Sequence, residues 1–118
     1  YEAVRFSFAE GYRAAKNLLA RGREFTAIFA MADVMAIGAV RALKDAKLRV
    51  PEDVSVIGFD GLAVGQYTVP TLSTISQSVD AMAQRSVDIL LENISQSRPP
   101  RYETVPFDLV LRESTERK

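Results

Sequence analysis

The sequence predicts an α/β fold in which a parallel β-sheet is flanked by helices. Two observations support this prediction. Segments with helical periodicity alternate with short apolar runs, and these runs are typical of strands covered on both faces. Parallel strands need crossover connections, which the intervening helices supply. The length of 118 residues, with 47% hydrophobic and 25% charged side chains, fits one globular domain or part of a larger one.

The chain begins with a predicted helix and a predicted strand. Ser7 and Glu10 form a capping-box pattern that is followed by apolar residues at helical spacing. Gly22 is a plausible end for this helix. Residues 25–31 then form a short apolar run, which predicts a strand.

A second helix and a second strand follow. Asp33 is well placed to cap a helix over residues 34–48. Residues 54–59 predict a buried strand, in which Gly58 allows another part of the backbone to approach closely. Asp60 lies where this strand gives way to a long loop.

The rest of the chain predicts a strand, a helix and an extended ending. Residues 72–76 predict a third strand because β-branched residues are frequent there. Ser78 is placed to cap a third helix, whose apolar stripe runs from Val79 to Ile94. Residues 104–111 predict one or two extended segments.

Three polar side chains are expected at one edge of the sheet. Asp33, Asp60 and Gln77 each follow a predicted strand directly. In open α/β sheets, ligands bind outside the carboxyl ends of the strands, so these residues predict a binding site. Each acid also has a structural explanation, because Asp33 could simply cap its helix and Asp60 could form a turn.

The helix predicted over residues 34–48 is apolar on two sides. One stripe begins at Met35, while Val34 and Ile37 lie off it. Two explanations are open. The helix is either sandwiched within the core, or its second face contacts another subunit, with Arg41 at the edge of that contact.

Composition argues against several classes of function. With no Cys and no His, the chain has no disulfide, no thiolate metal site and no histidine base. The 15 basic and 15 acidic residues give no electrostatic signature of nucleic-acid binding. No apolar run approaches the roughly 18 residues of a membrane span. We expect no catalytic residue, no metal and no cofactor. An enzyme that uses Asp33 and Asp60 as an acid pair is the weaker alternative, because no nucleophile elbow or phosphate-binding loop accompanies them.

Four blocks of the sequence resemble, in order and spacing, the LacI/GalR family of bacterial transcription regulators. They are FAMADVMAIGA at 29–39, LRVPEDVSVIGFD at 48–60, VPTLSTI at 69–75 and LVLREST at 109–115. The resemblance implies that residues 1–118 form most of the carboxy-terminal subdomain of a periplasmic-binding-protein-like (type I) core. It also implies that the amino-terminal subdomain and the DNA-binding headpiece are absent, so that operator DNA is bound only through the absent headpiece.

The same resemblance implies a ligand site. Asp60 matches the acid that accepts hydrogen bonds from effector hydroxyls or amines, and Gln77 matches a polar position in the same cleft. Ala32 stands where sugar-binding relatives often carry asparagine, which removes one polar contact. We expect the site to comprise Asp60, Gln77, Ala32, Asp33 and Phe59. Phe59 is either an apolar wall of the site or a core residue.

The resemblance also implies a homodimer. In family members that dimerise, the helix matching residues 34–48 and the loop matching residues 64–69 lie at the subunit interface. We expect contacts there from Val34, Ile37, Arg41, Val64, Gln66 and Tyr67.

The resulting prediction is a non-enzymatic part of a cytoplasmic regulator that senses a sugar or a related polar metabolite, with no membrane contact. The alternative is a fragment of a periplasmic sugar-binding protein of an ABC transporter, although such proteins usually lack the LREST ending at 111–115. Because the family core contains further segments, we also expect an exposed sheet edge or an exposed apolar patch.

Overall fold

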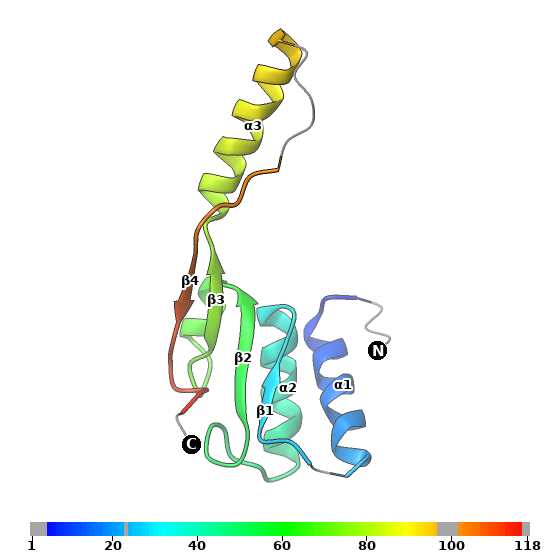
Figure 1. The fold of residues 1–118 in the computed structure, drawn as a ribbon. Helices are drawn as coiled ribbons and strands as arrows, with labels where there is room; N and C mark the ends of the chain where they lie inside the picture. Colours follow the sequence, from blue (N-terminus) through cyan, green and yellow to red (C-terminus); the bar gives the residue numbers. More distant parts are fainter. Residues whose placement is uncertain (1–4, 23, 97–101, 117–118) are drawn as a thin grey trace.

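The computed structural model describes residues 5–22, 24–96 and 102–116. Figure 1 shows a sheet with two helices packed beside it and a third helix that extends away from it. In chain order the elements are α1 (Phe8–Ala20), β1 (Ala27–Phe29), α2 (Asp33–Asp45), β2 (Ser55–Asp60), the 3-10 helix η1 (Ala63–Gln66), β3 (Ser73–Gln77), α3 (Val79–Gln96) and β4 (Phe107–Val110).

The sheet is mixed rather than wholly parallel. Its strand order is β1-β2-β3-β4, with β1, β2 and β3 parallel to one another and β4 antiparallel to β3. The prediction of a parallel sheet flanked by helices is therefore confirmed for the first three strands. The chain leaves the sheet after β3, runs along α3 and returns through β4, so β4 runs in the opposite direction (Figure 1).

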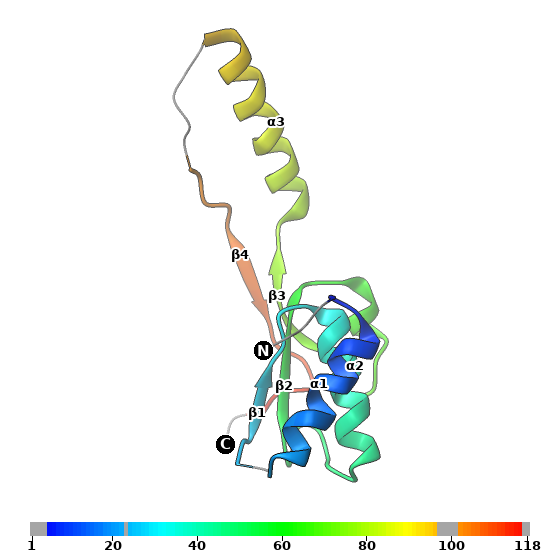
Figure 2. The same ribbon diagram turned by 90° about the vertical axis from the view of Figure 1, so that its right-hand side faces the viewer.

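Helices α1 and α2 cover the same face of the sheet (Figure 2). Their backbones approach closely at two glycines. A Cβ atom at Gly11 would lie 2.1 Å from the Met35 carbonyl oxygen, and one at Gly38 would lie 2.1 Å from the Phe8 carbonyl oxygen. Helix α2 therefore packs closely against α1 as well as against the sheet.

The core lies between α2 and the first three strands. Four apolar side chains are almost completely buried there: Val54 just before β2, Val56 in β2, Leu43 in α2 and Leu72 just before β3. Ser7 caps α1 as predicted, because its hydroxyl accepts a hydrogen bond from the Glu10 amide at 3.2 Å.

Two predicted boundaries were too wide. The run at 25–31 contributes only Ala27–Phe29 to the sheet, because just these residues pair with β2. Helix α2 ends at Asp45 rather than at residue 48, and Lys47 has a positive φ of 62°.

The second face of the sheet lacks a helix among the described residues. Side chains alternate along a strand, so Ile57 and Phe59 point away from the face on which Val56 is buried. The strand register aligns Phe59 with Ile75, and Ile75 with Leu109. Leu109 is 57% exposed. The expected exposed apolar patch is therefore present.

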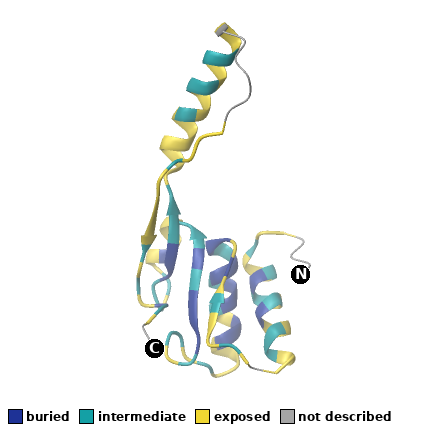
Figure 3. Ribbon diagram, in the orientation of Figure 1, coloured by how far each residue is buried: buried dark blue, intermediate teal, exposed yellow. Residues whose placement is uncertain are grey.

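Helix α3 and residues 102–106 form an arm that projects from the sheet (Figures 1 and 3). Residues 79–95 of α3 are all half-buried or exposed. The principal extents of 58 × 28 × 23 Å and the radius of gyration of 17.6 Å reflect this arm. A compact chain of this length would have a radius of gyration of roughly 13 Å.

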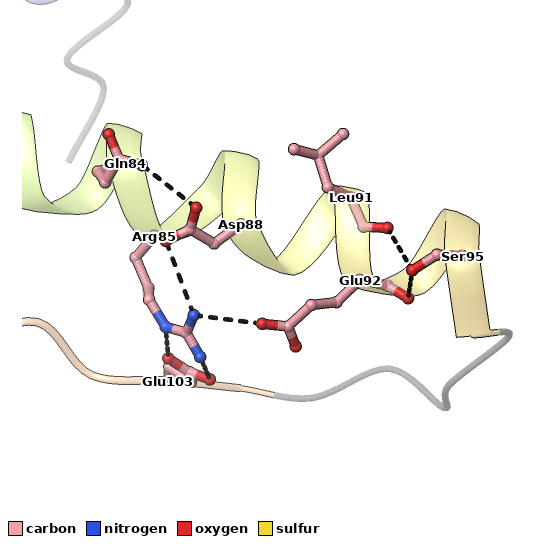
Figure 4. A network of polar contacts seen from close by, with 7 residues as sticks. All are labelled: Gln84, Arg85, Asp88, Leu91, Glu92, Ser95 and Glu103. Atoms are coloured by element: carbon pink, nitrogen blue, oxygen red, sulfur yellow. Dashed lines mark hydrogen bonds and ion pairs between the residues drawn. The ribbon is translucent and has the colours of Figure 1, made fainter.

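The two parts of the arm are joined by an exposed ion-pair network (Figure 4). Arg85 donates from Nε and Nη2 to the two carboxylate oxygens of Glu103, and further ion pairs connect it to Asp88 and Glu92. The hydrogen bonds to Glu103 raise the pKa of Arg85. Exposed ion pairs of this kind stabilise little, so they do not replace an apolar core.

After β4 the chain runs past the first residues of β2 and β3 and joins these two strands. Ser114 is fully buried; its hydroxyl donates to the Val56 carbonyl oxygen at 2.6 Å and accepts from the Ser73 amide at 2.8 Å. The Val56 amide in turn donates to the Ser114 carbonyl oxygen at 2.7 Å. Among the described residues, no helix is long and apolar enough to cross a membrane.

Candidate functional site

Two of the predicted polar residues meet at the carboxyl ends of β2 and β3. The Gln77 side-chain amide donates from Nε2 to Oδ1 of Asp60 at 3.1 Å, and both side chains are half-buried. These residues end neighbouring parallel strands, which is why they lie together. Asp60 has a φ of 115°, a conformation that is uncommon for residues other than glycine. The pair presents a carboxylate and an amide, both able to bond hydroxyl groups.

Asp33 lies below this pair and not at its rim. It is fully buried at the first residue of α2. Its Oδ1 accepts from the Thr74 hydroxyl and its Oδ2 accepts from the Leu62 amide, each at 2.6 Å. The prediction that Asp33 caps α2 is wrong, because the N-cap residue is Ala32 and no side chain caps the helix there. The carboxylate bonds to the neighbouring strand and loop instead.

Thr74 connects Asp33 to the turn that follows Asp60. Its hydroxyl oxygen accepts from the Gly61 amide at 3.2 Å while its proton goes to Asp33. Gly61 has a φ of 80°, and a Cβ atom there would lie 2.3 Å from the Ser76 hydroxyl oxygen. Thr74 was not predicted, because a threonine in a strand is ordinarily explained by β-propensity.

An apolar cavity of about 220 Å³ adjoins the polar pair through Gln77. Phe59 forms part of its wall, and its ring packs edge-on against Phe29 with the ring centres 6.5 Å apart. Ala32 is 4% exposed and packs within the core, and it is not among the residues that line this cavity. The cavity also has lining residues that were not predicted, namely Ile75, Ser78, Met82, Val105, Pro106 and Phe107.

The polar pair and the cavity beside it have the features of a small-molecule binding site. Across residues 5–22, 24–96 and 102–116, no three His, Cys, Asp or Glu side chains are grouped so that they could hold a metal ion. What the site offers is a carboxylate acceptor, an amide and an apolar wall, a combination typical of small-molecule binding sites.

The residues expected at a subunit interface lie on α2 and on the loop that contains η1. Tyr67 is 84% exposed and Val64 is 42% exposed, and Gln66 is also exposed. The loop is held in shape by Thr68, whose hydroxyl bonds to the carbonyl oxygens of Gly65 and Pro70.

The α2 residues of that expected interface differ in exposure. Arg41 is exposed and pairs with Asp45 through Nε at 3.0 Å. Val34 and Ile37 are half-buried against the core. A cavity of about 200 Å³ separates α2 from the loop and is lined by Ile37, Val40, Arg41, Lys44, Thr68, Val69 and Leu72. The structure therefore brings the predicted helix and loop side by side.

Comparisons with known proteins are consistent with this geometry. The family model of the periplasmic binding protein-like domain matches residues 1–115. The HTH-type transcriptional regulator MalR of Clostridium butyricum is 35% identical over 109 residues, covering 92% of this chain and 32% of MalR. The chain thus spans about a third of the length of the curated relatives it matches.

Solved structures show the same similarity. The crystal structure of the lac repressor dimer bound to operator and the anti-inducer ONPF superposes with a TM-score of 0.87 at 34% identity, covering 92% of this chain and 38% of the repressor chain. A LacI family regulator from Arthrobacter sp. FB24 in complex with lactose gives a TM-score of 0.80 at 35% identity, covering 93% of this chain and 42% of that one.

Proposed function

This chain belongs to the LacI/GalR family, as part of its periplasmic binding protein-like core, and from this premise we propose that it senses a small-molecule effector within a transcriptional regulator. The observation that carries the proposal is the bonded pair of Asp60 and Gln77 at the carboxyl edge of the sheet, beside an apolar cavity. The relatives are named as transcriptional regulators, which agrees with a non-enzymatic role and does not favour the transport-protein alternative.

In the proposed site, Asp60 accepts hydrogen bonds from effector hydroxyls, and Gln77 fixes the carboxylate and adds a second contact. Phe59 supplies an apolar wall. A sugar fits this combination because its hydroxyl groups can donate to the carboxylate while its C–H face packs on apolar side chains. The lactose complex of the Arthrobacter relative supports a sugar as the first class to test.

The test is effector binding to the full-length protein carrying Asp60→Ala. A charge-assisted hydrogen bond contributes about 1.5–3 kcal/mol, so we expect an affinity loss of roughly ten- to a hundredfold. Calorimetric titration with a panel of mono- and disaccharides that includes lactose gives the measurement. Asp53→Asn is the matched control, because Asp53 lies before β2, at the opposite end of that strand, where it bonds Arg49. Equal affinity losses in both variants would contradict the assignment.

We further propose that the described residues form most of one subdomain of a two-subdomain core. The face of the sheet that no described helix covers would contact the rest of that core, and so would the exposed arm. Effector binding between the two subdomains would favour a closed arrangement and so change the position of DNA-binding parts that this chain does not contain, in a cytoplasmic protein.

Assembly is proposed to occur through α2 and residues 64–69 in an isologous two-fold contact. The exposed Tyr67 and Val69 beside α2 support this, and so does the dimer described for the lac repressor relative. Tyr67→Asp should dissociate dimers of the full-length protein in analytical ultracentrifugation. Tyr102→Asp is the control, since Tyr102 is 100% exposed outside this surface. Dimers that persist with Tyr67→Asp would exclude this interface.

A further inference from the structure

The side chain of Asp33 is fully buried, and each of its carboxylate oxygens accepts a hydrogen bond from another part of the protein. The Thr74 hydroxyl and the Leu62 amide each lie 2.6 Å from one oxygen. A buried carboxylate is costly unless it is fully hydrogen-bonded, and an apolar residue of similar size would serve packing better. The position of Asp33 therefore calls for an explanation beyond core stability.

The two donors belong to the segment that shapes the proposed effector site. Leu62 lies two residues after Asp60, and Thr74 also accepts from the amide of Gly61. Asp33 and Thr74 together thus fix both amides that follow Asp60. Asp60 holds a φ of 115°, and a conformation so disfavoured persists only when the surroundings determine it.

The strand beneath is shaped to admit this carboxylate. A Cβ atom at Gly58 would lie 2.2 Å from Oδ1 of Asp33. A Gly58→Ala change would therefore displace the Asp33 carboxylate while leaving Asp33 itself unaltered. The sequence thus offers two independent ways to disturb the same contact, one on α2 and one on β2.

We propose that Asp33 is a positioning residue of the effector site: it holds the Gly61–Leu62 turn against α2 and thereby directs the Asp60 carboxylate toward Gln77. Asp33 touches protein groups only, and acts on the effector through Asp60. The proposal rests on the proposed function, because it assumes that Asp60 receives the effector.

Hydrogen exchange in the full-length protein tests the first step without any ligand. Asp33→Asn replaces one acceptor by a donor, so peptides that cover residues 59–62 should exchange at least tenfold faster, while peptides that cover residues 54–57 change little. Gly58→Ala should have the same local effect. Leu43→Ala is the control, because it weakens the core of α2 without touching the turn. Equal acceleration of both peptides in Asp33→Asn would overturn the proposal.

Affinity for the saccharide panel tests the second step. Asp33→Asn should weaken binding about tenfold, Thr74→Val should do the same, and Thr74→Ser, which keeps the hydroxyl, should restore it. A loosened turn with unchanged affinity would overturn the positioning role. If the wild-type protein binds no saccharide, the ligand class of the proposed function fails. The exchange of residues 59–62 then decides whether Asp33 holds the turn, and unchanged exchange there overturns the proposal.

Discussion

The two helices α2 and α3 have similar sequence patterns and very different surroundings. Both carry a stripe of apolar residues, and α2 carries further apolar residues off that stripe. In α2, Leu43 is completely buried between α1 and the sheet, whereas in α3, Leu90 is 59% exposed. In Figure 3, α2 contains buried segments, whereas the described part of α3 contains none. An apolar stripe thus shows which face of a helix is suited to packing. Whether that face is buried depends on whether another part of the structure packs against it.

The largest expected effect compares these two leucines directly. Leu43→Ala removes a fully buried side chain and should lower the free energy of unfolding by about 3 kcal/mol, since large-to-small core changes leave a cavity. Leu90→Ala in the 118-residue chain should cost less than about 1 kcal/mol. Urea denaturation followed by circular dichroism measures both.

The same pair tests whether the arm has a partner. In the full-length protein, the Leu90→Ala cost should approach that of Leu43→Ala, because the proposed second subdomain would cover the α3 stripe. If Leu90→Ala costs as little in the full-length protein as in the chain alone, the arm is not covered there and the two-subdomain proposal loses its support.

The second comparison is between a position where α1 and α2 are in close contact and an exposed position of α3. Gly38→Ala places a methyl group 2.1 Å from the Phe8 carbonyl oxygen, so α1 and α2 must separate. We expect a loss of about 2 kcal/mol, after allowing for the roughly 1 kcal/mol by which alanine favours a helix over glycine. Ala83→Val, at an exposed position of α3, is the control and should change stability by less than about 0.5 kcal/mol. An unchanged melting temperature for Gly38→Ala would show that the helices are not packed this closely.

Local sequence patterns predicted the structure correctly where the interacting groups are close in the sequence or where strand direction alone brings them together. The Ser7 cap depends on Glu10 alone, and it was predicted correctly. The proximity of Asp60 and Gln77 also followed from the sequence, because parallel strands place their carboxyl ends on one edge. Both predictions needed no knowledge of side-chain packing.

Predictions failed where distant residues decide the outcome. Asp33 follows a strand and precedes a helix, which is the pattern of a cap, yet its carboxylate bonds Thr74, 41 residues away in the sequence. A local pattern cannot distinguish a helix cap from a carboxylate that accepts a hydrogen bond from such a distant donor. The glycine at 58 was the available signal, since a glycine inside a strand marks close approach. The antiparallel direction of β4 likewise depends on the path through α3.

The segment after β4 gives a third comparison, because it attaches the end of the chain to the core through Ser114. Ser114→Ala leaves the Val56 carbonyl and the Ser73 amide without their buried partner, and should cost about 2 kcal/mol. Ser86→Ala in α3 is the control. Its hydroxyl bonds the Met82 carbonyl at an exposed position, so its loss should be close to neutral. Equal effects of the two changes in thermal denaturation would mean that Ser114 does not join β2 to β3.

The smallest expected effect is a pH dependence of the free energy of unfolding that arises from Glu113, in the same segment after β4. Glu113 accepts from the amide and the hydroxyl of Thr71, each at 2.9 Å, and these bonds lower the pKa of Glu113 below its ordinary value of 4.5. A carboxyl whose pKa is lowered on folding stabilises the fold fully above its unfolded pKa, and this contribution is lost as the pH falls through the folded pKa. Glu113→Gln should therefore be less stable than the wild type near pH 7, and the difference should shrink below pH 4.5. Urea denaturation across this range measures it, and a difference that stays constant with pH would show that the ionised carboxylate does not contribute. Because Glu113 is exposed, Glu113→Gln should destabilise the protein less than Ser114→Ala does. The two changes together distinguish the contribution of the buried contact after β4 from that of the exposed one.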